Sequence, residues 1–335
     1  MAYPDLSMYR EDDAVGLRWV ADPEAVTTPG RFLDSGFQRI DVKYAEAVLA
    51  QLVEAVIERL HGIDDSESNQ LRADWHAIQH SLIDEPKLCA RLGELGLDPY
   101  SEETDESVEE ALEAEALPEL LIGDLLAATT PPRLNEDLAD VRLFLDQLPA
   151  SSLQSSSSQA QQRRAMMLAI SPHHLPYRAG YARAEALRDS LRLSSFAPGD
   201  RDPASIVRSA LGAFDVSLVP SKVGRCVDAV VERNGVLALA AEQRAPRSTR
   251  FLLARALHHW MFVDGAAPGL RLLTRANDWQ QAASRAFAAE LLAPAAALAT
   301  RLEGRTDWDV AEELAEEFNV HPMVIAHQLE NHGLG

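Results

Sequence analysis

The sequence has very few cysteines and no segment of the kind that targets or anchors a chain. Its 335 residues include only two cysteines, Cys89 and Cys226, and no CxxC pair. This excludes a disulfide-stabilised scaffold and a cysteine-ligated zinc site, and it fits a reducing compartment. The first fifteen residues show no basic region followed by an apolar one, and no apolar run reaches the length of a membrane span. We therefore expect a cytoplasmic protein with no membrane partner.

Positive charge is also scarce. Lysine occurs only at positions 43, 87 and 222, and the formal net charge is −21. Residues 92–132 contain twelve acidic side chains and no lysine or arginine. A phosphate backbone repels a chain with this charge, so we do not expect nucleic acid as a partner. Arginines are spread through the C-terminal half, so a local basic patch there is an alternative that the sequence leaves open.

The sequence lacks the short motifs of several large enzyme classes. It contains no GxSxG, no phosphate-binding glycine loop and no GxGxxG after a predicted strand. Hydrophobic residues make up 47% of the chain, which is enough for a packed core. The length suits two domains of ordinary size. No cofactor is expected.

The first 149 residues are predicted to form a mainly helical, acidic domain. Turn signals in residues 1–40 separate short mixed segments, which indicates an irregular or short-strand region. Apolar residues from position 42 to 60 recur at helical spacing, with Asp41 as the expected N-cap. Further helices are expected over residues 66–83, 86–96, 107–126 and 134–148. Pro118 is expected to kink or restart the helix that contains it.

A low-complexity stretch, ASSLQSSSSQAQQ at residues 150–162, lacks the apolar side chains that packing needs. Such composition is typical of a flexible linker. The expected organisation is therefore a domain over residues 1–149, a linker over 150–170 and a second domain over 171–335.

The second domain is expected to combine helices with a small β-sheet. Helices are predicted over residues 177–193 and 202–211, and strands over 216–219, 227–232 and 236–241. Asn234-Gly235 joins the last two strands and is the strongest short hairpin signal. Two closing helices are expected over residues 307–318 and 322–331. The whole chain is thus predicted to be a mostly helical α+β protein.

Two apolar helices near the C-terminus resemble those of a known family. They are FLLARALHHW at residues 251–260 and QQAASRAFAAELLAP at residues 280–294. The pair is similar to the active-site helices of the ImmA/IrrE zinc metallopeptidases. That family has a phenylalanine, an HExxH motif, and a second helix with a glutamate ligand before a phrase close to FAAELL-P. The resemblance covers about residues 175–335, with the elements in the family's order, and it implies a zincin-like domain.

The residues that carry the family's chemistry are replaced. The resemblance places the first zinc histidine at Arg255, the general-base glutamate at Ala256 and the third ligand at or beside Ala283, so only His259 remains. The motif works because two imidazoles four residues apart share one helix face. A guanidinium stays charged and offers no lone pair to zinc. We therefore expect no bound metal and no catalytic residue, and predict a degenerate metallopeptidase domain.

The cleft that holds zinc and a peptide in active relatives is expected to bind a protein here. Its candidate lining residues are Arg255, His258, His259, Gln281, Arg285 and Glu290. By spacing, Arg255 shares a helix face with His259, and Gln281 shares one with Arg285. The resemblance implies a repressor or toxin-like regulator as partner, in stress, phage or mobile-element regulation. Equally, Arg255 could pair with Glu290 or another acid and only hold the two helices together.

Two other functions stay open. One is an active zinc endopeptidase with rebuilt ligands, for which the nearby candidates are His258, His259, Asp278 and Glu290. The other is a DNA-binding regulator that uses the closing helix pair, where residues 320–322 resemble the turn of a helix-turn-helix. Residues 320–332 contain no lysine or arginine, and glutamates crowd the pair. Because phosphate contacts supply much of DNA affinity, this composition favours a packing role.

Overall fold

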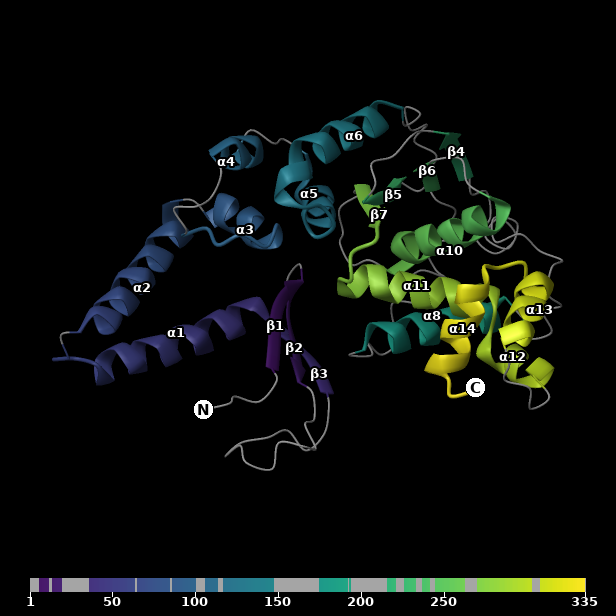
Figure 1. Ribbon diagram of the computed structural model, residues 1–335, viewed down its shortest axis with the longest axis horizontal. Coiled ribbons are helices and arrows are strands. Elements are labelled where there is room, and N and C mark those ends of the chain that lie inside the picture. The colour runs from purple at the N-terminus through teal and green to yellow at the C-terminus, as the bar shows by residue number, and fades with distance from the viewer. Residues whose placement is uncertain are drawn as a thin grey trace. The chain divides into compact units, whose positions relative to one another are not determined.

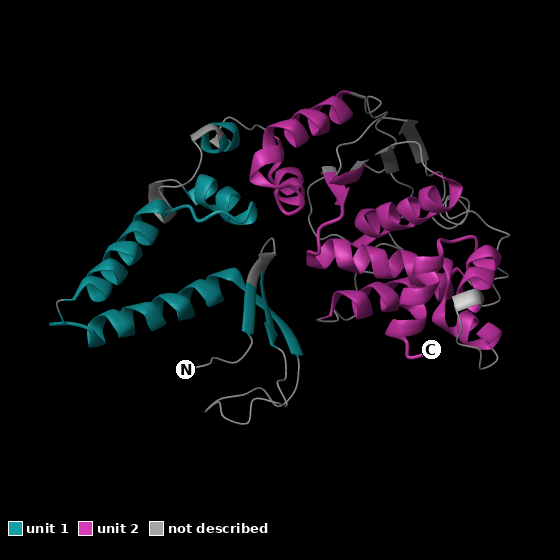
Figure 2. Cartoon of the chain, viewed as in Figure 1, with its two compact units in different colours: residues 1–115 teal, residues 116–335 magenta. Residues whose placement is uncertain are grey.

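The computed structural model describes residues 6–11, 14–19, 36–63, 65–84, 86–100, 106–113, 117–147, 175–191, 193, 216–220, 226–232, 237–241, 245–262, 270–302 and 308–334. Helices dominate these residues and two small sheets accompany them, so the protein is mostly helical and of the α+β class. The chain divides into two compact units, residues 1–115 and 116–335 (Figure 2).

Unit 1 begins with a three-stranded antiparallel sheet. Its strands are β1 (Leu6–Glu11), β2 (Ala14–Trp19) and β3 (Gly36–Asp41), with β2 in the middle. The indole of Trp19 lies against Gly36 so closely that a Cβ at this position would overlap the ring. Glycine therefore lets Trp19 pack across the neighbouring strand.

The helix expected over residues 42–60 is α1 (Val42–Arg59), which follows β3 directly. The Asp41 side chain accepts a hydrogen bond from the backbone N–H of Tyr44 at 3.1 Å, and this confirms the expected N-cap. Only Val42 and Ala45 of this helix are buried. The apolar face of α1 is therefore fully buried only at its N-terminal end, and Val53 and Ile57 are partly buried.

The rest of unit 1 is helical, and its last helix ends sooner than expected. The helices are α2 (Ser66–Asp84), α3 (Pro86–Glu94) and α4 (Glu106–Glu113). Residues 107–126 form two helices, because Pro118 restarts the chain as the N-cap residue of α5 (Glu119–Leu126). Proline has no backbone N–H and disfavours the α conformation in the residue before it. The division between the two units falls at this break.

Helices α5 and α6 (Leu134–Gln147) belong to unit 2, although the sequence suggested a division near residue 150. Asp124 of α5 supplies the physical reason. Its carboxylate accepts hydrogen bonds from Arg271 at 2.8 and 2.7 Å, and another from the backbone N–H of Leu272 at 2.8 Å. Both side chains of this ion pair are buried. The expected linker, residues 150–170, lies outside the described residues.

The sheet of unit 2 has the strand order β4-β6-β5-β7. The strands are β4 (Val216–Pro220), β5 (Val227–Glu232), β6 (Leu237–Ala241) and β7 (Leu270–Thr274). β4 runs parallel to β6, whereas β5 pairs antiparallel with both β6 and β7. The three strands expected from the sequence are confirmed, and β7 was not predicted. Asn234 and Gly235 lie outside the described residues, as does the helix expected over 202–211.

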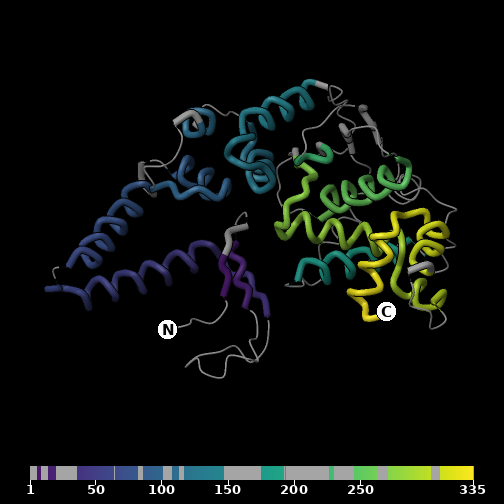
Figure 3. Tube along the Cα trace, in the orientation of Figure 1, coloured from purple at the N-terminus to yellow at the C-terminus, as the bar shows by residue number. Residues whose placement is uncertain are grey.

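Three helices follow one another away from this sheet (Figures 1 and 3). α10 (Pro246–Phe262) contacts the sheet, and α11 (Trp279–Leu292) packs against both α10 and α8 (Pro176–Ser190). Gly180 lets α8 approach α11 closely, since a Cβ there would lie 2.7 Å from the backbone nitrogen of Phe287 and overlap the carbonyl oxygen of Ala283. The polar residues of α10 and α11 thus lie between the sheet of unit 2 and helix α8, which packs closely against α11.

The C-terminal helices close the core of unit 2. They are α12 (Ala295–Leu302), α13 (Trp308–Phe318) and α14 (Pro322–Asn331), and the last two confirm the expected closing pair. Phe318, Val320 and Ile325 are buried in the same core as α10 and α11. The His321 imidazole caps α14 by accepting a hydrogen bond from the N–H of Met323 at 3.2 Å.

Among the helices of the described residues, none is long and apolar enough by itself to cross a membrane. α11 and α12 reach the required length and composition only as a pair, with a bend of 49° between them. Their apolar side chains, including Phe287, Leu291 and Leu298, are buried in the core of unit 2.

Candidate functional site

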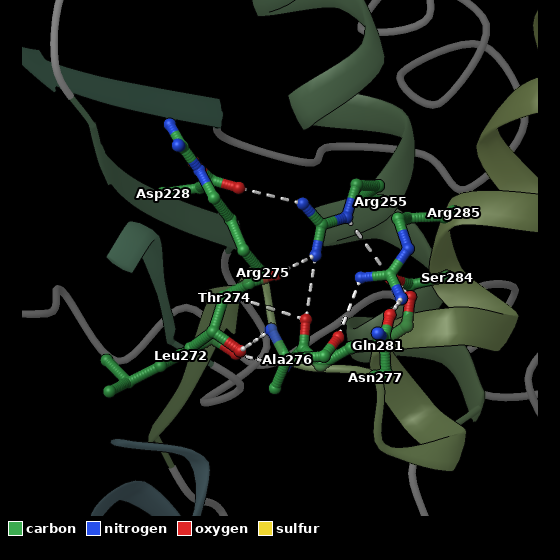
Figure 4. A network of polar contacts seen from close by, with 10 residues as sticks. All are labelled: Asp228, Arg255, Leu272, Thr274, Arg275, Ala276, Asn277, Gln281, Ser284 and Arg285. Atoms are coloured by element: carbon green, nitrogen blue, oxygen red, sulfur yellow. Dashed lines mark hydrogen bonds and ion pairs between the residues drawn. The ribbon is translucent and has the colours of Figure 1, made fainter. Parts of the chain in front are cut away.

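Arg255 lies at the centre of a buried polar network between α10, α11, β5 and β7 (Figure 4). Its Nη1 donates to Asp228 of β5 at 3.0 Å, and its Nε donates to the Ser284 hydroxyl at 3.2 Å. Its Nη2 donates to the Thr274 carbonyl and to Gln281 Oε1, each at 2.7 Å. The guanidinium therefore has partners from two strands and one helix, and all of them are internal.

Gln281 connects this network to the edge of the sheet. Its Oε1 also accepts the backbone N–H of Thr274 at 3.1 Å, and its Nε2 donates to the Leu272 carbonyl at 2.8 Å. A side-chain amide thus satisfies both kinds of backbone group on β7. Asp278 caps α11 by accepting the N–H of Gln281 at 2.8 Å, which fixes the turn from which this side chain projects.

The electrostatics of the network centre on Arg255 and Asp228. The two side chains are 5% and 8% exposed, so water screens their attraction only weakly. Burial lowers the pKa of Arg255 to about 10, while the nearby Asp228 carboxylate opposes this shift. Arg255 is therefore charged at neutral pH. A buried charge of this kind requires its partners, because an unpaired one would be costly.

Two arginines form the part of the network that solvent reaches. Arg285 donates to the Ala276 carbonyl at 2.8 Å and to Asn277 Oδ1 at 2.9 Å. Arg275 approaches the second oxygen of Asp228 at 3.5 Å, and its side chain is 70% exposed. Figure 4 shows the Arg285 guanidinium beside Arg255 and the Arg275 guanidinium on the far side of Asp228. We call Arg275, Asn277 and Arg285 the rim of the network.

The two histidines of α10 are fully buried rather than open to a cleft. Nε2 of His258 lies 2.9 Å from Nη1 of Arg183 on α8. Since arginine can only donate, this nitrogen accepts and the neutral ring carries its proton on Nδ1. Burial, followed by the charges of Arg183 and Arg255, holds the pKa of His258 well below its usual value. His258 also lies between the rings of Phe262 and Phe287, which fits a role in packing.

Glu290 belongs to a different cluster. Its carboxylate accepts Nε2 of Gln328 at 2.7 Å and the backbone N–H of Ala295 at 3.1 Å, so it joins α11 to α12 and α14. Burial raises the pKa of Glu290 to about 7. The acid that pairs with Arg255 is Asp228 and not Glu290, the one named from the sequence. Of the six candidate residues, it brings Arg255, Gln281 and Arg285 together with Asp228 and leaves Glu290 apart.

Two polar residues of α14, Gln328 and Asn331, make internal contacts. Gln328 is fully buried and also donates to the Ala293 carbonyl at 3.0 Å. Asn331 donates to the Tyr181 hydroxyl at 3.0 Å. These side chains, which a DNA-recognition helix would present to bases, instead bind within unit 2.

The described residues contain no group of three histidine, cysteine, aspartate or glutamate side chains that could hold a metal ion. Ala256 and Ala283, where the resemblance implies the base and the third ligand, are fully buried and apolar. The arrangement around Arg255 can hold helices and strands together, and its rim can donate hydrogen bonds to an anion.

Sequence reasoning missed Asp228, which is the acid of the network. One signal was present, since Asp228 stands between Val227 and Ala229 in an apolar strand. A charged residue in such a strand is buried only when it is paired. The partner itself was not readable, because Arg255 lies 27 positions further along the chain.

No model of a known protein family matches this sequence, and no curated protein matches it either.

Proposed function

We propose that the C-terminal part of the chain is a metallopeptidase-like domain without metal chemistry, and that the protein acts by binding another protein. The observation that carries this proposal is the internal bonding of Arg255. This residue stands where the ImmA/IrrE resemblance puts the first zinc histidine. Its guanidinium has partners in Asp228, Thr274, Gln281 and Ser284, and this supports the proposal that a structural cation stands in place of a metal ion.

The rim of the network supports binding to an acidic segment. Arg275 and Arg285 display guanidiniums in a chain whose net charge is −21. Guanidinium groups bind carboxylates through paired hydrogen bonds. The rest of this acidic chain would repel a carboxylate. Active relatives cleave helix-turn-helix repressors, so the proposed partner is an acidic segment of such a regulator or of a toxin. The partner is held and not cleaved.

Metal content tests the first half of the proposal. Protein purified with added zinc is expected to retain no stoichiometric metal by elemental analysis. It is also expected to leave helix-turn-helix repressors intact, because a missing general base alone lowers such a rate by roughly 10²- to 10⁴-fold. One zinc per chain that is lost in His259→Ala, together with chelator-sensitive cleavage, would show an active peptidase with rebuilt ligands.

Charge reversal at the rim tests the second half. Proteins cross-linked to the intact chain in cells are expected to be lost when Arg275→Glu and Arg285→Glu are combined. Arg301→Glu is the matched control, because its side chain is 49% exposed in the same unit and pairs only with the partly exposed Glu317 among the ion pairs found there. Equal recovery from both variants would place the binding surface elsewhere.

A further inference from the structure

Two histidines of α2 lie one helical turn apart on its exposed side. The side chains of His76 and His80 are exposed, whereas Trp75 and Ile78 of the same helix are partly buried. Residues four apart on a helix share a face. The ring centroids of the two histidines are 4.3 Å apart, and the rings are tilted by 47° to each other. We call His76 and His80 the α2 pair.

The separation of the two rings suits a single metal ion. A histidine nitrogen binds an ion such as Zn²⁺ at about 2.0 to 2.1 Å, which puts the ring centre about 3.2 Å from the ion. Two rings at neighbouring positions on one ion, about 90° to 110° apart, therefore have centres about 4.5 to 5.2 Å apart. The observed 4.3 Å lies close to the lower end of this range, so a small adjustment of two exposed side chains reaches it.

We propose that the α2 pair binds one divalent transition-metal ion, with Cu²⁺ held most tightly. Imidazole is a good ligand for copper, nickel and zinc, and the affinity of a given site is highest for Cu²⁺. Each histidine gives one ring nitrogen to the ion, so its other nitrogen keeps any contact that it makes with the protein. The net charge of −21 raises the local concentration of cations around the chain.

The proposed site has only two protein ligands. In the part of the chain that the structure describes, no third histidine, cysteine or carboxylate joins the pair in a group that could hold an ion. Water or a group from another molecule then fills the other positions on the ion. Such an ion exchanges with the solvent, so desalting removes it. Zinc that persists through purification would therefore report on His259 and its neighbours, and the two metal tests stay separate.

Calorimetric titration of the full chain with CuCl₂ tests the proposal. All proteins carry Cys89→Ser, because a partly exposed thiol also binds copper. His80→Ala should lower the affinity of the tightest site by roughly 10²-fold, since the second imidazole otherwise binds within the same complex. His327→Ala is the matched control, because His327 of α14 is 62% exposed and should leave this affinity unchanged.

A spacing variant distinguishes chelation by the pair from binding to single exposed histidines. Ala73→His combined with His76→Ala keeps two histidines at exposed positions of α2 but places them seven residues apart, about 10.5 Å along the helix. One ion cannot bind both, so this variant should bind Cu²⁺ as weakly as His80→Ala does. Circular dichroism should show unchanged helix content, because the changed positions on α2 are exposed.

The ligands themselves can be counted. Electron paramagnetic resonance of the Cu²⁺ complex should show two imidazole nitrogens on the copper, and His80→Ala should remove one of them. Equal affinity in the parent and the spacing variant, or a single nitrogen in the parent complex, would overturn the proposal and leave only binding to separate surface histidines.

Discussion

At the scale of single residues, Arg255 shows what a guanidinium does at a buried position on a helix. A histidine there would offer a lone pair to a metal, whereas the guanidinium offers donors in a fixed fork. Those donors reach Asp228, Gln281, Ser284 and a carbonyl of β7. A site of this kind stabilises the fold through its hydrogen bonds.

Arg255→Ala is expected to lower the free energy of unfolding by about 3 to 5 kcal/mol, because it leaves buried Asp228 without its main partner. Urea denaturation measures this change. The double variant Arg255→Ala with Asp228→Ala should be less destabilised than the sum of the single changes, since the two residues interact. Arg301→Ala should cost no more than about 1 kcal/mol as an exposed pair. An Arg255→Ala protein of unchanged stability would indicate that its main partner is external.

Glu290 is expected to make stability depend on pH. Burial raises its pKa from 4.5 to about 7 in the folded protein, so the folded state binds the proton more tightly than the unfolded state. The contribution of Glu290 is complete below about pH 4.5 and is lost as the pH rises through about 7, by about 3 kcal/mol in all. Urea denaturation between pH 4.5 and 8 should show this fall in the parent protein.

The control for this titration is Glu290→Gln, which retains an oxygen for Gln328 and Ala295. The difference between the two proteins isolates Glu290, because Asp124, whose pKa burial also raises to about 7, titrates in both. Parallel pH profiles for the parent and the variant would contradict the assignment.

At the scale of elements, the close approach of α8 to α11 depends on one residue without a side chain. Gly180 faces the backbone of α11, including the carbonyl of Ala283 and the nitrogen of Phe287. Helices that contact each other at a glycine leave no space for a larger side chain at that position. This contact holds the helix that carries Gln281 and Ser284 in place beneath α10.

Gly180→Ala is therefore expected to destabilise unit 2 by about 1 to 3 kcal/mol through overpacking, even though alanine favours helices. Gly93→Ala is the matched control, because Gly93 lies in α3 and a Cβ there would meet nothing within 4 Å. That change should be neutral or stabilising by up to about 1 kcal/mol. Thermal unfolding followed by circular dichroism compares the two. Equal behaviour of both variants would mean that α8 can move away from α11 at little cost.

At the scale of the whole molecule, the division between the two compact units falls at residues 115 and 116, and not at the segment whose composition is most like a linker. The Ser- and Gln-rich residues 150–162 have the composition of a linker, and a protease is still expected to cleave there. Helices α5 and α6 precede this segment, yet they belong to unit 2 with the sheet. The ion pair of Asp124 with Arg271 joins a residue before this segment to a residue after it.

Limited proteolysis is expected to cut between residues 150 and 165 and to give two pieces on a denaturing gel. The pieces should nevertheless elute together in native size-exclusion chromatography, because α5 stays bound to β7. With Asp124→Ala the nicked pieces should separate more readily, whereas Asp140→Ala, a change on the same side of the cut but in α6, should not have this effect. Pieces that separate at once in the parent protein would favour a domain boundary near residue 150.

The sequence by itself determined most helices of the described residues and most strands of unit 2. Helical periodicity, the Asp41 cap and the break at Pro118 are local properties, and the backbone follows local preference where packing agrees with it. These features depend on residues within a few turns of one another.

Only the tertiary structure decided what Arg255 binds, where unit 2 begins and that β7 exists. The physical reason is that a buried charge takes whichever acid the fold brings near it, and Asp228 and Asp124 meet their arginines from 27 and 147 positions away. Likewise, β7 is recognised by its pairing with β5, which no local pattern in residues 270–274 encodes. Spacing places Arg255 on a helix face, whereas packing decides what lies opposite that face.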